Sequence, residues 1–583
     1  MTNKNKLATI AILAASAVIV VSCDGLGKMI KKQNTITYDI KPNPLEMHGD
    51  SVSLTITGKY PPKLFAKKAA VTVTPVITYN GGEVALKPVV LVGEKSTASG
   101  QKISYTNGGS FSYTDKIAFK PELKVSKLAI KASGQIKTKK PKDFKPTEIG
   151  DGTTATPLLV RNDEKGIFAK DNFVKVVSMN QSASIYYELN QSNVRASELK
   201  SEEMKKLVDF INSNQNNTTT YEFKGIEIIS SASPDGEESR NENLSKERGK
   251  SGSKALESQF PKPKKKGESI NPILESKTYS NRDIAEDWEG FRALIKASSY
   301  KDKDIILRAS EMYQDPKQRE VEISKLVETY KEIKEEVMPK LRRSMITLKV
   351  DKKSRTDEMI SRLMVSTPDS LSIEELLYGA TLTKDVNTKA NVYKAAEKKY
   401  PNDWRASNNY GVTLLMQNKI SEAGAAFERA AKNAPNEGAV NNGLGIVAAK
   451  NGDRNKAMEY YKKAKGAGTE VNYNMGILNV RDGKYDEAVR NFGSYNGVNL
   501  ALANLLAGKA EAVSGIIDAS NEKEAAIAYY IKAVAAARKG DKNAGIAALK
   551  TAIEKDGSFK QTAKEDAEFL KWKADADFTS LVQ

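Results

Sequence analysis

The sequence has very few of the residues that most enzymes use for catalysis. Among its 583 residues there is one histidine, His48, and one cysteine, Cys23. We therefore exclude a Ser-His-Asp triad, a histidine-rich metal site and a framework of disulfides. There is also no glycine-rich phosphate-binding loop and no set of carboxylates at metal-ligand spacing. His48 lies in a turn-rich stretch, PNPLEMHGD, and is expected to be exposed.

These absences predict a protein that is not an enzyme and that needs no cofactor or metal. A hydrolase that uses only carboxylates stays open, because paired acids need not be close in sequence. The hydrophobic and charged fractions, 39% and 28%, are those of ordinary globular proteins, and the length predicts several domains. The net charge of +18 suits an anionic partner such as phospholipid head groups or a nucleic acid.

Long apolar runs are missing except at the N-terminus. Residues 7–21 are uncharged and mostly apolar, and two lysines precede them. This run is shorter than the ~20 residues of a membrane-spanning helix and fits a secretory signal. It ends in the sequence VVSC, which resembles the lipobox of bacterial lipoproteins. The resemblance implies a signal peptide, 1–22, and a diacylated Cys23 as the first mature residue; the alternative is a plain secretory signal with an incidental cysteine.

Lipid attachment would also account for a single cysteine in an exported protein. Export argues against nucleic acid as a partner. Residues 23–36 are expected to form a lipid-anchored tether, with lysines that either touch anionic head groups or face solvent. These lysines are Lys28, Lys31 and Lys32.

Residues 37–140 have the two-residue alternation of β-strands. Val52, Leu54 and Ile56 alternate with polar residues, and Asn80-Gly81-Gly82 is a turn signal between two such stretches. Short strands separated by Gly, Pro and Asn predict an all-β sandwich. Residues 141–178, which begin in a Lys/Pro-rich stretch, are expected to be a linker with strands.

Residues 179–351 have an α/β pattern. Strands are predicted at 185–189, 221–229 and 345–350, and Met204, Leu207, Val208 and Ile211 have helical spacing. Further helices are predicted in the second half of 231–256 and from apolar stripes within 284–295 and 323–333.

The motif Asn241-x-x-Leu244-Ser245-x-x-Arg248 resembles the core of the OmpA-like peptidoglycan-binding domain. The resemblance covers about 179–256 and resumes at 339–351, so that 257–338 would be a large helical insertion. It implies the β-α-β-α-β order of that family and makes peptidoglycan a candidate ligand.

The family holds the diaminopimelate group with the motif arginine and with an aspartate eight residues before the asparagine. Arg248 matches the arginine, but Ser233 stands at the aspartate position and Asp235 lies two residues further on. An arginine pairs with a carboxylate and an aspartate with an ammonium, so that one half of the site is changed. We therefore expect the fold to be retained and peptidoglycan binding to be weak or absent.

Residues 357–583 are alanine-rich and contain an internal repeat. A glycine is followed at 12, 16 and 19 residues by Ala, an aromatic residue and Ala. The second copy begins 34 residues after the first, and the third, which keeps only the glycine, the first Ala and the aromatic residue, begins 31 residues later. A period near 34 is typical of tetratricopeptide repeats, in which small residues lie at close helix crossings. The positions are Gly411, Ala423, Phe427 and Ala430; Gly445, Ala457, Tyr461 and Ala464; and Gly476, Ala488 and Phe492.

Together these patterns predict a multidomain, non-enzymatic lipoprotein scaffold on the periplasmic face of the outer membrane. An all-α tetratricopeptide solenoid should bind envelope proteins through its concave face, unless it only spaces or oligomerises the molecule. A surface-exposed adhesin or a fimbria-associated component is the alternative function.

Overall fold

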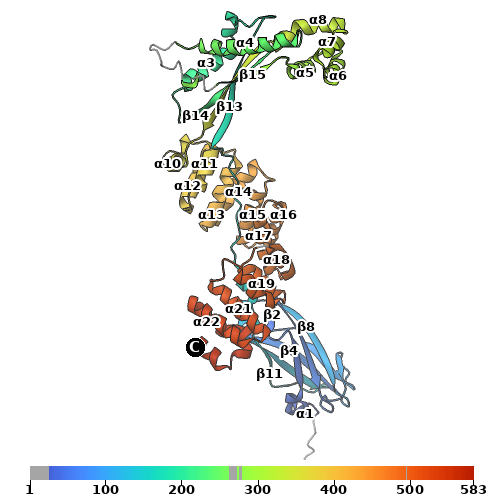
Figure 1. Cartoon of the computed structure of the whole chain (residues 1–583). Helices are drawn as coiled ribbons and strands as arrows, with labels where there is room; N and C mark the ends of the chain where they lie inside the picture. Colours follow the sequence, from blue (N-terminus) through green and yellow to red (C-terminus); the bar gives the residue numbers. More distant parts are fainter. Residues whose placement is uncertain (1–24, 262–271, 275–278, 494) are drawn as a thin grey trace, which may run out of the picture. The chain divides into compact units, whose positions relative to one another are not determined.

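The computed structural model describes residues 25–261, 272–274, 279–493 and 495–583, so that the expected signal peptide and Cys23 lie outside the described residues. The chain forms two compact units (Figure 1). The first contains the residues up to Ala169 together with Tyr400–Gln583, and the second contains Lys170–Lys399. Within the described ranges no helix combines the length and apolarity needed to cross a bilayer.

The first unit begins with a β-sandwich, which we call the β-domain. Val52, Leu54 and Ile56 face the core between its two sheets, as their alternation predicts. Tyr79 pairs with Gly82 across a two-residue turn in which Gly81 has a φ of +93°, a conformation that favours glycine. One sheet contains β1 Thr37–Lys41, β2 Leu45–His48, β3 Ser51–Tyr60, β8 Gly109–Ala118 and β12 Thr153–Thr154. The other contains β4 Ala69–Tyr79, β5 Gly82–Ala85, β6 Val89–Gly93, β7 Gln101–Ile103, β9 Ser126–Ile136, β10 Lys142–Asp143 and β11 Thr147–Asp151.

The described part of the expected tether is not a free tether. It forms helix α1, Gly25–Lys31, and a 3-10 turn, η1, Gln33–Thr35. Leu26 and Met29 of α1 are buried in the core of the β-domain. Two buried positions are too few to give a recognisable period, so the sequence did not predict this packing. Residues 141–178 also differ from the predicted linker. Three strands in this range, β10, β11 and β12, belong to the sheets of the sandwich.

The second unit contains a four-stranded sheet in the order β13-β16-β14-β15. β13 begins nine residues before the predicted strand, and the predicted helix around Met204 is α3, Glu202–Asn214. The sequence does not predict strand β15, because YSNRDI has no apolar alternation. This strand includes Ile284, for which the apolar spacing predicts a helix. The strands are β13 Val176–Tyr186, β14 Tyr221–Ser231, β15 Tyr279–Ile284 and β16 Arg343–Lys353.

Helices α3 and α4, Glu238–Glu257, pack their apolar residues into the core of this sheet. A separate group of helices has its own core around Phe291 and Ile333, within and just beyond the predicted insertion. The predicted helical stripe over 323–333 is divided between two helices, α7 Pro316–Ser324 and α8 Val327–Glu336. The remaining helices of this unit are α2 Ala196–Leu199, α5 Trp288–Ala297, α6 Lys303–Met312, α7 Pro316–Ser324, α8 Val327–Glu336, α9 Met338–Leu341, α10 Asp357–Ser366, α11 Ile373–Thr381 and α12 Val386–Lys399.

The rest of the first unit is all helical, as predicted, although residues 357–399 group with the second unit instead. The repeat glycines face the aromatic residue of the next helix: an added Cβ would lie 2.9 Å from Phe427 at Gly411, 2.5 Å from Tyr461 at Gly445 and 2.7 Å from Phe492 at Gly476. The helices are α13 Trp404–Met416, α14 Ile420–Asn433, α15 Gly438–Lys450, α16 Arg454–Lys463, α17 Thr469–Arg481, α18 Tyr485–Phe492, α19 Val498–Leu506, α20 Val513–Asp518, α21 Ala526–Lys539, α22 Lys542–Lys555, α23 Ser558–Glu565 and α24 Ala576–Val582.

The β-domain packs against these helices within the first unit. The guanidinium of Arg454 donates to both carboxylate oxygens of Asp50, at 2.8 and 3.0 Å. His48 is exposed, as expected, and its ring lies edge-on to that of Tyr485 with centroids 4.8 Å apart.

Candidate functional site: the asparagine row of the repeats

The first helix of each successive repeat carries buried asparagine side chains. A buried carboxamide has two donors and an acceptor, and leaving them without partners is costly. Their partners therefore identify what this face of the array binds. We call the following residues the asparagine row: Asn408 and Asn409 on α13, Asn442 on α15, Asn474 on α17 and Asn499 on α19.

The row holds an extended segment of the same chain, residues 160–169, which we call the strap. Each of three asparagines bonds both main-chain groups of one strap residue. Asn499 accepts from the N–H of Arg161 (2.8 Å) and donates to its carbonyl (3.0 Å). Asn474 does the same with Lys165 (2.7 and 3.0 Å), and Asn409 with Ala169 (2.7 and 3.0 Å).

The asparagines are also connected to one another. Asn442 donates to the carbonyl of Lys165 (2.9 Å) and accepts from Asn474 (2.9 Å). Asn408 donates to the carbonyl of Ile167 (2.9 Å) and to the carboxamide oxygen of Asn409 (3.1 Å). Because these bonds are to main-chain groups, they hold the backbone of the strap without reading its side chains.

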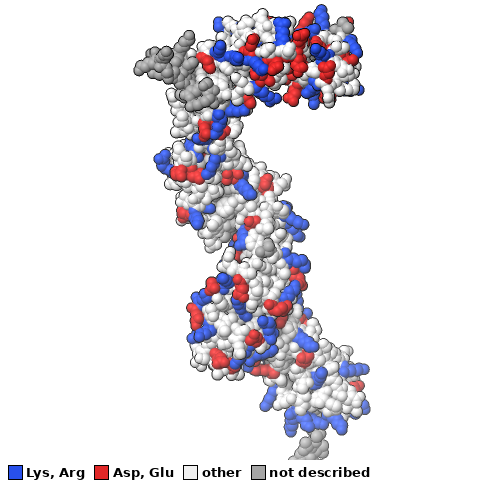
Figure 2. Space-filling model, viewed as in Figure 1, with Lys and Arg blue, Asp and Glu red and all other residues white. Residues whose placement is uncertain are grey.

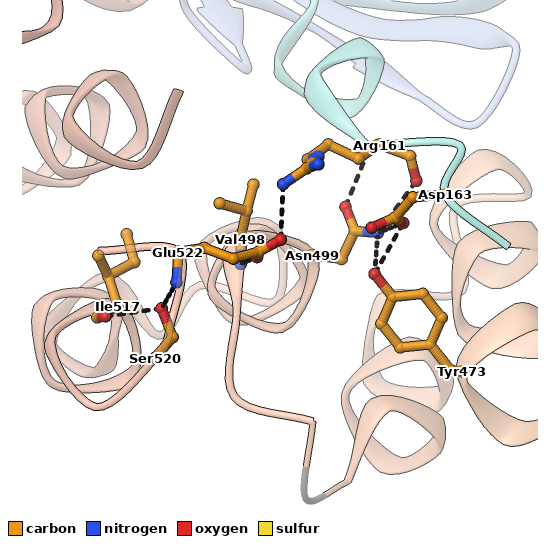
Figure 3. A network of polar contacts seen from close by, with 8 residues as sticks. All are labelled: Arg161, Asp163, Tyr473, Val498, Asn499, Ile517, Ser520 and Glu522. Carbon is orange, nitrogen blue, oxygen red and sulfur yellow. Dashed lines mark hydrogen bonds and ion pairs between the residues drawn. The ribbon is translucent and has the colours of Figure 1, made fainter. Parts of the chain in front are cut away.

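Charged side chains add selectivity at one end of the strap (Figure 3). Arg161 donates to the carboxylate of Glu522 at 2.6 Å. Asp163 accepts from the hydroxyl of Tyr473 at 2.7 Å and from Asn499 at 3.1 Å. Burial, together with the charge of Asp163, raises the pKa of Tyr473 well above its ordinary value, so that this hydroxyl stays a donor.

The middle of the strap is selected by shape and by a cation–π contact. The ammonium of Lys165 lies 4.4 Å from the centre of the Tyr473 ring. At Gly166 an added Cβ would lie 2.8 Å from a methyl group of Val412, so that a larger residue requires Val412 to move. Ile167 packs against a buried cluster of the repeats. The strap is thus recognised through its main chain and through several of its side chains.

The residues expected to bind peptidoglycan lie together in the second unit, but their polar groups already have partners within the protein. Arg248 is 1% exposed. Its guanidinium donates to the carbonyls of Gln191 (3.0 Å), Ser231 (2.9 Å) and Glu188 (3.4 Å). Burial lowers the pKa of Arg248 to about 10.

The other half of this cluster is closed by an arginine that the sequence analysis did not single out. Arg342 donates to Asp235 at 2.8 Å and to the hydroxyl of Ser233 at 2.9 Å. Ser233 in turn donates to Asp235, and Asn241 donates to the carbonyl of Ser233 at 3.1 Å. The cluster therefore resembles a self-contained structural network more than an open binding site.

The asparagine row was not predicted from the sequence. A signal was present, since asparagines stand two or three residues before each repeat glycine: Asn408 and Asn409 before Gly411, Asn442 before Gly445, and Asn474 before Gly476.

Among the residues that the structure describes, no group of three or more His, Cys, Asp or Glu side chains could hold a metal ion.

Comparison with known proteins identifies the repeats. A family model described as Tetratricopeptide repeat matches residues 390–438 and 417–471. The C-terminal region therefore contains tetratricopeptide repeats. No curated protein sequence matches the chain.

Solved structures with similar repeats include a tetratricopeptide repeat protein from Parabacteroides merdae, at 14% identity over 36% of this chain and 90% of that one, with a TM-score of 0.28. YrrB, described as a TPR protein with an unusual peptide-binding site, gives 19% identity over 36% of this chain and 100% of its own, with a TM-score of 0.22. PilW, described as a type IV pilus biogenesis factor, gives 13% identity over 40% of this chain and 100% of its own, with a TM-score of 0.27.

Proposed function

We propose that this protein is a non-enzymatic scaffold of the bacterial cell envelope, lipid-anchored at Cys23 on the periplasmic face of the outer membrane. Tetratricopeptide arrays bind peptides or proteins along their inner faces. The observation that supports a scaffold most directly is that the asparagine row binds an extended peptide segment, the strap, and that this segment belongs to the same chain. The array thereby holds the chain segment that follows the β-domain.

Occupation of the row by the strap changes how a partner could bind. A partner that enters the row as an extended peptide has to displace residues 160–169. The strap competes at the effective concentration of a short connection, of the order of millimolar. If the strap sequence as a free peptide has an affinity of about 1 μM for the row, any competing peptide should bind about 1,000-fold more weakly to the intact protein. Envelope proteins that bind the array would therefore either use its other faces or release the strap.

A peptide-binding experiment tests this. A fluorescent peptide with the sequence of 158–171 is titrated into the full chain and into a variant with Arg161→Ala, Asp163→Ala and Lys165→Ala, whose own strap is weakened. We expect binding to the variant and little to the unmodified chain. Adding Asn409→Ala, Asn474→Ala and Asn499→Ala to the variant should remove the binding. Equal binding to all three proteins would contradict the role of the row.

The second unit carries the OmpA-like resemblance, and we propose that it keeps this fold without the wall ligand. Support comes from Arg248, whose guanidinium is bonded to three main-chain carbonyls, and from Asp235, which is paired with Arg342. A surface-exposed adhesin remains the rival function. Treatment of intact cells with a protease separates the two, since a periplasmic scaffold should resist cleavage until the outer membrane is permeabilised.

A further inference from the structure

The two ends of the β-domain differ in what they contact. At one end β4 begins at Ala69, which pairs with Ile136, the last residue of β9; β6, which pairs with β4, also ends here. Helix α1 packs at this end, where the main-chain N–H of Ala66 donates to the sulfur of Met29 at 3.2 Å. We call this the lysine end, for the reason given below.

The opposite end of the same strands lies against the helical repeats. β4 ends at Tyr79, which pairs with Ser126, the first residue of β9. The N–H of Gly152 donates to the carbonyl of Ser126 at 2.7 Å, and a Cβ at Gly152 would lie 2.9 Å from that of Ala567. The eleven residues of β4 span about 35 Å, so the repeats and α1 are separated by the length of the β-domain.

Lysines are concentrated at the end that carries α1. They come from α1 and the residues after it, from the residues before β4 and after β6, and from the residues after β9. All are exposed, and the same stretches carry only two acidic residues, Glu94 and Asp143. The lysines are Lys28, Lys31, Lys32, Lys63, Lys67, Lys68, Lys95, Lys137, Lys139, Lys140, Lys142 and Lys145. Figure 2 shows a blue band at this end of the β-domain.

We propose that the lysine end of the β-domain binds the head groups of anionic phospholipids. This inference rests on the proposed lipid anchor at Cys23. Gly25 is already part of α1, which is packed into the β-domain, and two residues reach at most about 7 Å, so an acyl chain on Cys23 would enter the membrane beside these lysines. Lysine ammonium groups near an anionic surface each strengthen binding about fivefold and need no fixed geometry.

The same arrangement sets the orientation of the first unit. Because α1 is packed and is not a free tether, the β-domain would rest on the membrane by its lysine end. The repeats, at the opposite end, would then be held away from the lipid, where their surface stays accessible to other proteins.

Cosedimentation with lipid vesicles tests this independently of acylation. The full chain with Cys23→Ala is mixed with vesicles of phosphatidylcholine alone or with about one third phosphatidylglycerol. We expect binding only to the anionic vesicles, with a steep loss as salt is added, since screening shortens the range of these charges.

Two charge-matched variants locate the surface. Lys67→Glu, Lys139→Glu and Lys140→Glu together reverse three charges at the lysine end. Lys116→Glu, Lys120→Glu and Lys124→Glu reverse three exposed lysines that lie outside it. Three lost contacts should weaken vesicle binding by on the order of 100-fold in the first variant, with a change of only a few fold in the second.

Equal losses in both variants, or equal binding to neutral vesicles, would overturn the proposal. Retention on DNA but not on anionic vesicles would also overturn it and indicate a nucleic-acid surface. The anchor is tested separately by incorporation of labelled palmitate into the unmodified protein. Absence of the label would reject the anchor, whereas the vesicle result would still report on the lysine end. Circular dichroism of both variants verifies that they fold.

Discussion

Replacing Asn474 by alanine should release the middle of the strap. Asn474 is fully buried and makes three hydrogen bonds: it accepts from the N–H of Lys165 and donates to the carbonyl of Lys165 and to Asn442. The alanine variant loses all three. The Lys165 carbonyl keeps its bond from Asn442, at 2.9 Å, whereas the main-chain N–H of Lys165 and the carboxamide oxygen of Asn442 each lose the partner that Asn474 supplied.

The expected magnitude follows from this count. A buried main-chain donor without a partner costs about 1–3 kcal/mol, and each lost hydrogen bond contributes about 0.5–1.5 kcal/mol. Opening of the strap should therefore become easier by about 2–3 kcal/mol, since water partly replaces the lost bonds. Because 1.4 kcal/mol is a factor of ten, the open population rises on the order of 30- to 100-fold.

Limited trypsin digestion measures this change, because the strap contains a cleavage site after Lys165. When the strap opens and closes faster than it is cut, the cleavage rate follows the open population. The matched control is Asn455→Ala, at an exposed position on α16. Cleavage after Lys165 at the same rate in Asn474→Ala and Asn455→Ala, in proteins with equal helix content, would refute the view that the row holds the strap.

Three further outcomes are expected. Gly445→Leu should lower the free energy of unfolding of the repeats by about 1–3 kcal/mol, because its Cβ would lie 2.5 Å from the Tyr461 ring, whereas Gly515→Ala, with no heavy atom within 4 Å, should change it little; circular dichroism melts compare the two. The full chain should cosediment weakly or not at all with peptidoglycan sacculi, and Arg248→Ala should lower the melting temperature of the second unit without changing sedimentation; tight binding that Arg248→Ala abolishes would show a working wall site. Cys23→Ala should leave the membrane fraction after a high-salt wash and take up no labelled palmitate; a protein that stays membrane-bound would contradict the anchor.

The elements that could be predicted from the sequence are those whose side chains face one environment at a regular spacing. Val52, Leu54 and Ile56 alternate because one face of β3 is buried, and Gly445 and Tyr461 keep their offset because two helices cross closely there. Strand β15 has no such alternation, and its position comes from parallel pairing with β14. Its sequence is mainly polar, so no periodic pattern marks it as a strand.

The candidate site was harder to predict for a different reason. The repeats could be recognised, but the ligand of their asparagines is main chain, which leaves no pattern in the sequence of the strap. Only side chains such as Arg161 and Asp163 carry information, and their partners Glu522 and Tyr473 are more than 300 residues away in sequence. In the cluster around Ser233, the partner Arg342 also comes from a distant segment, 109 residues further along the chain.

The direction of the strap gives its binding a structural consequence. It meets α19 first, at Arg161, and α13 last, at Ala169, so that it runs against the order of the repeats. The second unit begins at Lys170 and ends at Lys399, and α13 starts at Trp404. Both chain connections to the second unit therefore leave the first unit at the same repeat. While the strap is bound, its ten residues stay attached to the repeats and add no length to the connection before Lys170. Without it, the connection before Lys170 gains the ten residues of the strap as free chain, which would reach about 33 Å when extended. The bonds of the asparagine row thus determine whether residues 160–169 are held on the repeats or are free chain before Lys170. Any partner that competes for the row would change that state.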